Sequence, residues 1–299
     1  MTQFARHAIR KHRLDVNSYP DFHHWTVENP ELFWTEVWEW CGVIASRKGN
    51  TVLVDGDKMP GARWFPEARL NFAENLLRRG DRGDALVFWD ESGAQRRVSY
   101  SDLTSEVSRA VQALQALGLR AGDRACAFIP NLPETAMLAL AALSQGIVWS
   151  SCSPDFGVDG VVERFGQIEP KVLFCADGYR YNGEQHDSLA RVAEIVEKLP
   201  SVRKVIVVPH LDPNVDVSDV PKAVRLDEWL RRYTPGEIAF AQLPFDHPVY
   251  ILFTSGTTGK PKCIVHGAGG SLLAGLKMHK LQLDIRPGDR YFYFCTTNW

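Results

Sequence analysis

Residues 249–262 read VYILFTSGTTGKPK, an apolar run that passes directly into a short polar loop. The first five residues are large and apolar, as expected for a buried strand. The next nine positions hold four hydroxyl side chains, two glycines and two lysines. Glycine lets backbone N–H groups approach an anion closely, hydroxyls can donate to phosphate oxygens, and lysines offset phosphate charge. A polyphosphate is therefore the expected partner of this loop.

The loop does not have the spacing of a Walker A motif, which requires Gly-x-x-x-x-Gly-Lys-Ser/Thr leading into a helix. Only two residues separate Gly256 from Gly259, and Pro261 follows directly after Lys260. Residues 262–266 are β-like and carry no helix cap, so the context is strand, loop, strand. The remaining alternative is a plain hydrophilic hairpin, which would require neither this density of hydroxyls nor both lysines.

Strand and helix patterns alternate through the chain before this loop. Around Glu91-Ser92-Gly93 two strand-like segments predict a hairpin, and a helix capped by Ser101 and ended by Gly118 follows. Four further strands are expected at Ala125–Ile129, Ile147–Trp149, Val172–Cys175 and Val205–Val208. The helices expected between them are Pro133–Leu143, 161–168 and Leu189–Leu199. This order predicts βαβ units, and hence an α/β fold of layered, mostly parallel sheets with helices on their faces.

The first 80 residues differ from the rest in composition. They contain five of the nine tryptophans, and Asn29-Pro30-Glu31 has the residue types of a helix start. We interpret residues 1–80 as a helical, aromatic-rich cap region that packs onto the main domain, which would occupy residues 81–299. An aromatic ligand site is the alternative interpretation of the tryptophan cluster.

Composition limits the class of protein. The chain has 299 residues, enough for about two domains at roughly 150 residues each, and is 45% hydrophobic with a formal charge of -2. This balance favours neither a nucleic-acid nor a membrane-surface partner. The six cysteines lie far apart and form no Cys-x-x-Cys pair, which indicates free thiols in a reducing compartment. No signal peptide or membrane span is visible, so we expect a cytoplasmic protein.

The loop and its flanks resemble a known signature. Residues 253–262, FTSGTTGKPK, look like the phosphate loop of the adenylate-forming superfamily, which includes acyl-CoA synthetases, luciferases and peptide-synthetase adenylation domains. Other stretches resemble the acetoacetyl-CoA synthetase family in particular. They are DGDKMPGARWF at 55–65, WSSCSPDFG at 149–157, RFGQIEPK at 164–171, DGYRYNG at 177–183 and TTNW at 296–299. Acetyl- and propionyl-CoA synthetases share the layout but match these stretches less well.

The resemblance implies a two-step ligation. A carboxylate attacks the α-phosphate of ATP to give an acyl-adenylate and pyrophosphate, and the thiol of CoA then displaces AMP. Mg²⁺ would neutralise part of the phosphate charge, so the implied cofactors are ATP, Mg²⁺ and CoA. Thr254 and Lys262 would act in catalysis. The residues implied to hold the β- and γ-phosphates are Thr254, Ser255, Gly256, Thr257, Thr258, Gly259 and Lys262.

Further residues have a weaker signal. The resemblance places CoA contacts at Arg180, Tyr181, Asn182 and Gly183, where an arginine beside an aromatic ring suits a phosphate and an adenine. A solvated loop is the alternative there. Thr296, after an expected strand at Tyr291–Cys295, would line the pantetheine tunnel or acyl pocket, or simply end the strand.

Other candidates are expected to be structural. The pair His23-His24 has no third ligand nearby, so a metal site is not expected there. For His266 a structural role is favoured over a catalytic one. Cys152 has no evident base partner and is expected to be buried and inert.

The later motifs of the superfamily do not occur before Trp299. We therefore expect the chain to be the N-terminal portion of a longer enzyme and to be inactive in adenylation by itself. The expected substrate is acetoacetate, with CoA as the thiol. Two alternatives stay open, namely a short-chain acyl-CoA synthetase for acetate or propionate and a non-catalytic nucleotide-binding module. The sequence gives no indication of an oligomeric state.

Overall fold

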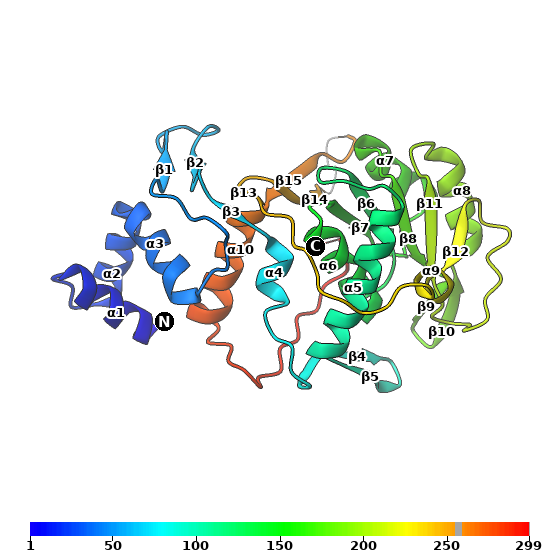
Figure 1. Cartoon of the computed structure of the whole chain (residues 1–299), viewed down its shortest axis with the longest axis horizontal. Coiled ribbons are helices and arrows are strands. Elements are labelled where there is room, and N and C mark those ends of the chain that lie inside the picture. The colour runs from blue at the N-terminus through cyan, green and yellow to red at the C-terminus, as the bar shows by residue number, and fades with distance from the viewer. Residues whose placement is uncertain (255–258, 299) are drawn as a thin grey trace. The chain divides into compact units, whose positions relative to one another are not determined.

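A computed structural model describes residues 1–254 and 259–298 of the chain. The chain divides into two compact units (Figure 1). The first contains residues 1–75, 242–247 and 267–293, and the second contains residues 76–241, 248–266 and 294–299.

The first unit begins with three helices, α1 (Thr2–His12), α2 (Tyr19–Glu28) and α3 (Pro30–Cys41). Short strand pairs follow, β1 (Leu53–Val54) with β2 (Arg63–Trp64) and β3 (Arg69–Leu70) with β13 (Leu243–Pro244), together with α10 (Ala268–Leu276) and the π-helical turn η1 (Lys277–Gln282). The helix α4 (Phe72–Leu76) ends this stretch of the chain.

Aromatic packing stabilises the first unit. The ring of Trp38 lies 4.9 Å from that of Phe65, which in turn lies 5.2 Å from Phe245. The predicted start of α3 at Pro30 is confirmed. The Asn29 side chain does not cap that helix, because its amide donates to the Trp25 carbonyl at the end of α2.

A seven-stranded sheet forms the centre of the second unit (Figure 1). Its spatial order is β12 (Ala223–Arg225), β11 (Lys204–Val208), β8 (Val172–Ala176), β6 (Arg124–Phe128), β7 (Val148–Cys152), β14 (Pro248–Phe253) and β15 (Cys263–Gly267). The pairs from β12 to β14 are parallel. This arrangement confirms the predicted α/β fold with a mostly parallel sheet.

Helices cover both faces of this sheet. Side chains of β6, β8 and β11 alternate between the faces, and those of Cys126, Leu173 and Val205 form one core with α7 (Val158–Ile168) and α8 (Leu189–Lys198). On the opposite face Phe174 packs against Trp229 of α9 (Leu226–Leu230). The helix α5 (Tyr100–Ala116) contacts α9 and α6 (Pro133–Ser144), so these helices share that face.

The connections that leave β6 and β8 therefore pass to opposite faces, through α6 and α8. In parallel α/β sheets, ligands bind at the carboxyl ends of strands where the connections diverge in this way. We expect a ligand site beside the segments that follow β6 and β8.

Two antiparallel hairpins complete the second unit. The first, β4 (Asp84–Asp90) and β5 (Gly93–Ser99), confirms the predicted hairpin. The second, β9 (Gly178–Tyr181) and β10 (Glu184–Asp187), carries residues 180–183 at and beside its turn, where all four are exposed.

Two local predictions were wrong. The helix expected to be capped by Ser101 begins at Tyr100, because the hydroxyl of Ser99 accepts the Asp102 N–H at 3.0 Å and so acts as the cap. Residues 291–295 form no strand in the described structure, and the rings of Phe292 and Phe294 are exposed. Local apolar composition suggested a strand there, but no neighbouring strand pairs with it.

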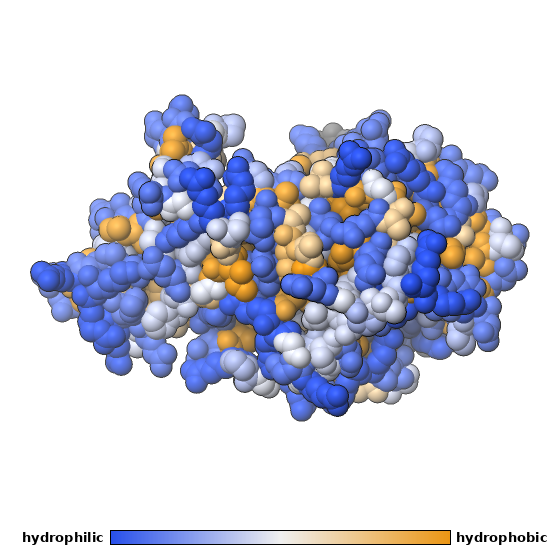
Figure 2. All heavy atoms as spheres, viewed as in Figure 1, coloured by the Kyte–Doolittle hydropathy of each residue, from blue (hydrophilic) through white to orange (hydrophobic). Residues whose placement is uncertain are grey.

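Hydrophilic residues dominate the face shown in Figure 2, as expected for a chain with 23% charged residues. None of the helices in the two described ranges has the length and apolar character required to cross a membrane.

Candidate functional site

The polar loop begins where β14 ends and finishes where β15 starts, so it is strand–loop–strand as predicted. Two hydrogen bonds close its neck. The Thr254 N–H donates to the Lys262 carbonyl, and the Lys262 N–H donates to the Thr254 hydroxyl oxygen, both at 3.1 Å. That hydroxyl accepts a bond from the backbone and, among the described residues, donates to none, so its proton can be offered to an anion.

Four of the predicted phosphate-binding residues, Ser255, Gly256, Thr257 and Thr258, lie outside the described residues. Of the described ones, Gly259 has φ +139°, a backbone region that favours glycine. The side chain of Lys262 is exposed, and within the described part of the chain its ammonium group forms no ion pair. The neck therefore presents one hydroxyl and one unneutralised cation at the end of a strand.

A glutamine on α7 fixes the second half of the loop. The side-chain amide of Gln167 donates to the Pro261 carbonyl at 2.9 Å and to the Glu163 carbonyl at 2.7 Å. Pro261 itself is buried. Gln167 thus connects the loop to a helix that packs on the central sheet, which restricts where Lys262 can lie.

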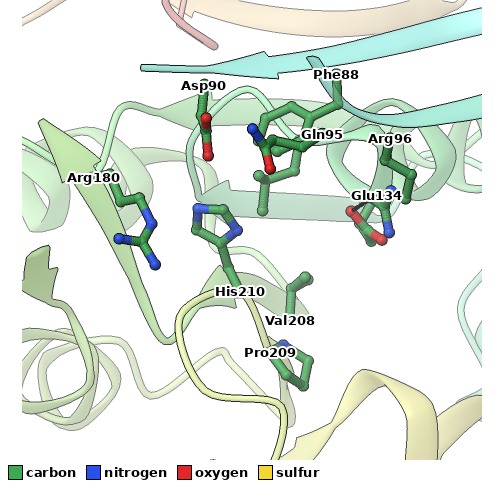
Figure 3. A pocket seen from close by; sticks show the side chains of 10 residues that line it. Phe88, Asp90, Gln95, Arg96, Glu134, Arg180, Val208, Pro209 and His210 are labelled. Atoms are coloured by element: carbon green, nitrogen blue, oxygen red, sulfur yellow. Dashed lines mark hydrogen bonds and ion pairs between the residues drawn. The ribbon is translucent and has the colours of Figure 1, made fainter. Parts of the chain in front are cut away.

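A cavity of about 360 Å³ lies at the carboxyl ends of β6, β8 and β11 (Figure 3). Hairpin β4–β5 forms its opposite wall. The lining residues are Phe88, Asp90, Gln95, Arg96, Leu132, Glu134, Arg180, Val208, Pro209 and His210. This cavity is beside the segments that follow β6 and β8, where the sheet topology favours a ligand site.

Charges in this cavity are partly paired. Arg96 and Glu134 form an ion pair at 2.6 Å. Burial lowers the pKa of His210, so this ring is neutral at pH 7 and can both donate and accept a hydrogen bond. The Phe88 ring meets it edge-on, with centroids 6.0 Å apart. Arg180 enters from the other side, next to His210 and Asp90 (Figure 3).

The carboxylate of Asp177 fixes the segment that carries His210. It accepts N–H bonds from His210, Leu211 and Asp212 at 2.8 to 3.0 Å. Since Asp177 directly follows β8, the end of β8 and the segment after β11 are held together. The ring of His210 therefore has a fixed place in the cavity.

The four residues with predicted CoA contacts lie in hairpin β9–β10. Arg180 lines the cavity, and Tyr181 is 69% exposed beside it. With the Gln185 amide in the orientation that satisfies both groups, its oxygen accepts from Arg180 at 2.8 and 3.0 Å. Asn182 and Gly183 form the turn, with φ values of +53° and +79°.

The segment around Thr296 also reaches the carboxyl edge of the sheet. The Thr297 hydroxyl donates to the Ile129 carbonyl at 3.1 Å, and the Thr297 carbonyl accepts from Ser151 of β7. Thr296 is exposed, and its hydroxyl donates to the Asn298 side chain at 2.7 Å. The loop neck and the Arg180 turn thus follow the ends of β14 and β8, and the Thr296 segment lies beside the ends of β6 and β7 at the same edge of the sheet.

Cys152 is buried, as expected, and His266 and His24 each contact a neighbouring side chain. Burial raises the pKa of Cys152 to about 12, so its thiolate is not accessible at neutral pH. The His266 ring packs on Tyr250 with centroids 4.8 Å apart. His24 pairs with Glu28 at 2.9 Å. Among the described residues no group of three or more metal-ligating side chains is arranged to hold a metal ion.

Family models match nearly the whole chain. The model described as AMP-binding enzyme matches residues 72–298, and the model described as Acetyl-coenzyme A synthetase N-terminus matches residues 19–76. The chain belongs to the AMP-binding enzyme family.

Known AMP-binding relatives are similar in sequence along the full length of the chain. An acetoacetyl-coenzyme A synthetase from Rhizobium meliloti is 49% identical over 100% of the chain and 46% of its own length. A malonamoyl-CoA synthetase from Penicillium aethiopicum is 37% identical over 100% of the chain and 43% of its own length. The solved acetoacetyl-CoA synthetase from Streptomyces lividans matches with a TM-score of 0.93 and 40% identity, covering 100% of this chain and 46% of that one. The chain spans about half the length of the relatives it matches.

Two residues of this AMP-binding chain gained a role only from the structure. Gln167 occurs in the stretch RFGQIEPK, but nothing in its local pattern predicts a bond to a loop that lies 94 positions later. Glu91 was predicted only as part of a hairpin turn, yet its carboxylate accepts bonds from Asn182 and Gly183.

Proposed function

We propose that this chain is part of an ATP-dependent acid–thiol ligase that forms acetoacetyl-CoA from acetoacetate, ATP and CoA. The reaction would proceed through an acyl-adenylate and release pyrophosphate and then AMP. The observation that carries the proposal is the loop neck at the carboxyl end of β14, with its available hydroxyl and unneutralised lysine, in a chain 49% identical to an acetoacetyl-coenzyme A synthetase.

In this proposal Thr254 and Lys262 act on the phosphates of ATP, together with Ser255, Gly256, Thr257, Thr258 and Gly259. The Thr254 hydroxyl donates to a phosphate oxygen, and Lys262 offsets the charge that develops as pyrophosphate leaves. Gln167 restrains the loop through Pro261, which reduces the entropy lost when the loop closes on ATP. The chain thus contributes positioning and charge to the adenylation step.

Mg²⁺ would supply further neutralisation of the phosphate charge when it binds with ATP. Among the described residues, the loop neck offers a hydroxyl and a cation but no carboxylate, so it is not suited to ligate Mg²⁺ directly. The phosphates, rather than side chains of this segment, are the expected ligands of the ion.

CoA would bind at the hairpin β9–β10. Arg180 suits a phosphate and the exposed ring of Tyr181 suits an adenine, while Asn182, Gly183 and Thr296 would contact other parts of the molecule. We further propose that residues 1–80 form the cap region and residues 81–299 the AMP-binding domain.

The six cysteines lie among the described residues and form no disulfide, which supports a cytoplasmic location.

ATP–pyrophosphate exchange tests the function directly. A complete ligase that contains residues 1–299 should catalyse exchange with acetoacetate, whereas residues 1–299 alone should not. Exchange that is equal with and without acetoacetate would contradict the substrate assignment. ATP binding with no turnover of any carboxylate would indicate a non-catalytic nucleotide-binding module.

A second candidate substrate is malonamate, because a malonamoyl-CoA synthetase is 37% identical over the whole chain. Acetate and propionate complete the set of short acids. A panel of the four carboxylates at equal concentration, compared by kcat/KM, discriminates among them. The acetoacetate proposal requires the highest value for acetoacetate.

A further inference from the structure

Glu91 lies at the tip of hairpin β4–β5, far in sequence from the turn that it contacts. Its Oε1 accepts the Asn182 N–H at 2.5 Å, and its Oε2 accepts the Gly183 N–H at 2.6 Å. Both carboxylate oxygens are therefore used, each by one backbone amide of the same turn. Bonds to a charged acceptor are shorter and stronger than neutral ones, and these distances are short.

The backbone of the turn explains why a carboxylate fits there. Asn182 and Gly183 have consecutive positive φ values of +53° and +79°, so their N–H groups converge on one acceptor. Successive N–H groups of this kind form a small concave site for an anion. The left-handed conformation is unfavourable for most residues, and a bound carboxylate helps to hold it.

Glu91 is not required by its own hairpin. The turn at the tip of β4–β5 is already held by Asp90, whose Oδ1 accepts both the N–H and the hydroxyl of Ser92 at 2.8 Å. The Glu91 side chain instead spans to a second hairpin. Fixing such a long side chain in one conformation costs conformational entropy, which a solvated glutamate would keep. The two hydrogen bonds to the turn offset that cost.

The contact between Glu91 and the turn determines the position of hairpin β9–β10, which carries the proposed CoA residues. Tyr181 is paired with Glu184 and Arg180 with Gln185, directly below the turn, so fixing the turn fixes the backbone that carries both side chains. Asp90, next to Glu91, and Arg180 line the same cavity (Figure 3). Glu91 therefore joins the two hairpins that form adjoining walls of this cavity.

We propose that Glu91 is a positioning residue for CoA, which holds Arg180 and Tyr181 ready for the phosphorylated adenosine end of that substrate. This inference rests on the proposed function, since it assumes that the hairpin β9–β10 binds CoA. Glu91 does not touch the reacting atoms, and it affects binding through the turn alone.

Calorimetric titration of CoA into a complete ligase that contains residues 1–299 tests the inference. Glu91→Gln keeps the size of the side chain but loses its charge, and should raise the Kd for CoA about threefold to tenfold. Glu91→Ala should raise it by at least about tenfold, while the Kd for ATP stays unchanged in both variants. Glu197→Gln, an exposed glutamate on α8, is the matched control and should leave both values unchanged.

Amide NMR shifts of residues 182 and 183 provide a readout that does not depend on CoA. In Glu91→Gln both resonances should move upfield, because one amide then donates to a neutral oxygen and the other, facing the side-chain NH2 group, loses its acceptor. Unchanged resonances would overturn the contact itself, whether or not CoA binding is altered.

Arg180→Ala separates failure of the inference from failure of the proposed function. If Arg180→Ala weakens CoA binding but the Glu91 variants do not, the positioning role is wrong and the CoA site stands. If Arg180→Ala also has no effect, or if the unmodified complete ligase does not bind CoA, the proposed CoA site is wrong and the inference is lost with it. A lower melting temperature with an unchanged Kd would mean that Glu91 only stabilises the fold.

Discussion

Substitution of Gln167 tests whether the phosphate loop must be held from outside. In Gln167→Ala the Pro261 carbonyl loses its 2.9 Å bond, and α7 loses one side-chain bond to Glu163. A neutral hydrogen bond of this kind contributes about 0.5–1.5 kcal/mol net. The Cys263 thiol also donates weakly to the Gln167 side chain at 3.8 Å, but the bond to Pro261 is the stronger contact with the loop. We therefore expect the ATP-bound loop to be destabilised by about 1 kcal/mol, which is about a fivefold change in equilibrium.

The assay is ATP–pyrophosphate exchange in a complete ligase that contains this chain. Gln167→Ala should lower kcat/KM for ATP about fivefold and leave the affinity for CoA unchanged. Gln167→Glu should lower it further, because a carboxylate cannot donate to Pro261 and adds negative charge near the polyphosphate. The matched control is Gln115→Ala on α5, where the side chain donates to Gln145 at 2.8 Å.

If exchange by Gln167→Ala equals that of the unmodified enzyme while Lys262→Ala is impaired, the loop does not depend on its bond to α7. Equal losses in Gln167→Ala and Gln115→Ala would show that the effect is general destabilisation. The melting temperature of each variant separates these cases, since Gln167 is exposed and its removal should change global stability little.

Three further predictions concern charge and reactivity. Lys262→Ala should slow exchange at least about tenfold without lowering the melting temperature, because the side chain is exposed, and unchanged exchange would contradict its role. Burial lowers the pKa of His210 in the folded state, so the unfolded state takes up the proton first as the pH falls below 6.5. His210→Asn should therefore lose less stability than the unmodified chain between pH 7 and 5.5, measured by calorimetry. A thiol reagent at pH 8 should label exposed Cys263 quickly and leave buried Cys126 and Cys152 unlabelled until the chain unfolds.

Strand and helix placement was largely predictable because each element carries its own pattern. The strands β6, β8, β11 and β14 were expected within about a residue at most ends. The errors arose where contacts with other parts of the chain decide whether an element forms or where it begins. Residues 291–295 are apolar enough for a strand, but a strand exists only if another strand pairs with it. Ser99 and Ser101 are both good caps, and the helix start is set by which hydroxyl meets the Asp102 amide.

The residue pattern alone was enough to predict the α/β fold class, the polar character of the loop after β14 and its difference from a Walker A motif. These follow from composition and spacing within short windows, which the chain encodes locally. Only the tertiary structure decided that Gln167 holds Pro261, that Glu91 holds the Arg180 turn, and that His210 and Arg180 face one cavity. Such contacts join residues far apart in sequence, and they depend on which strands become neighbours and which faces the connecting helices take, which no local pattern specifies.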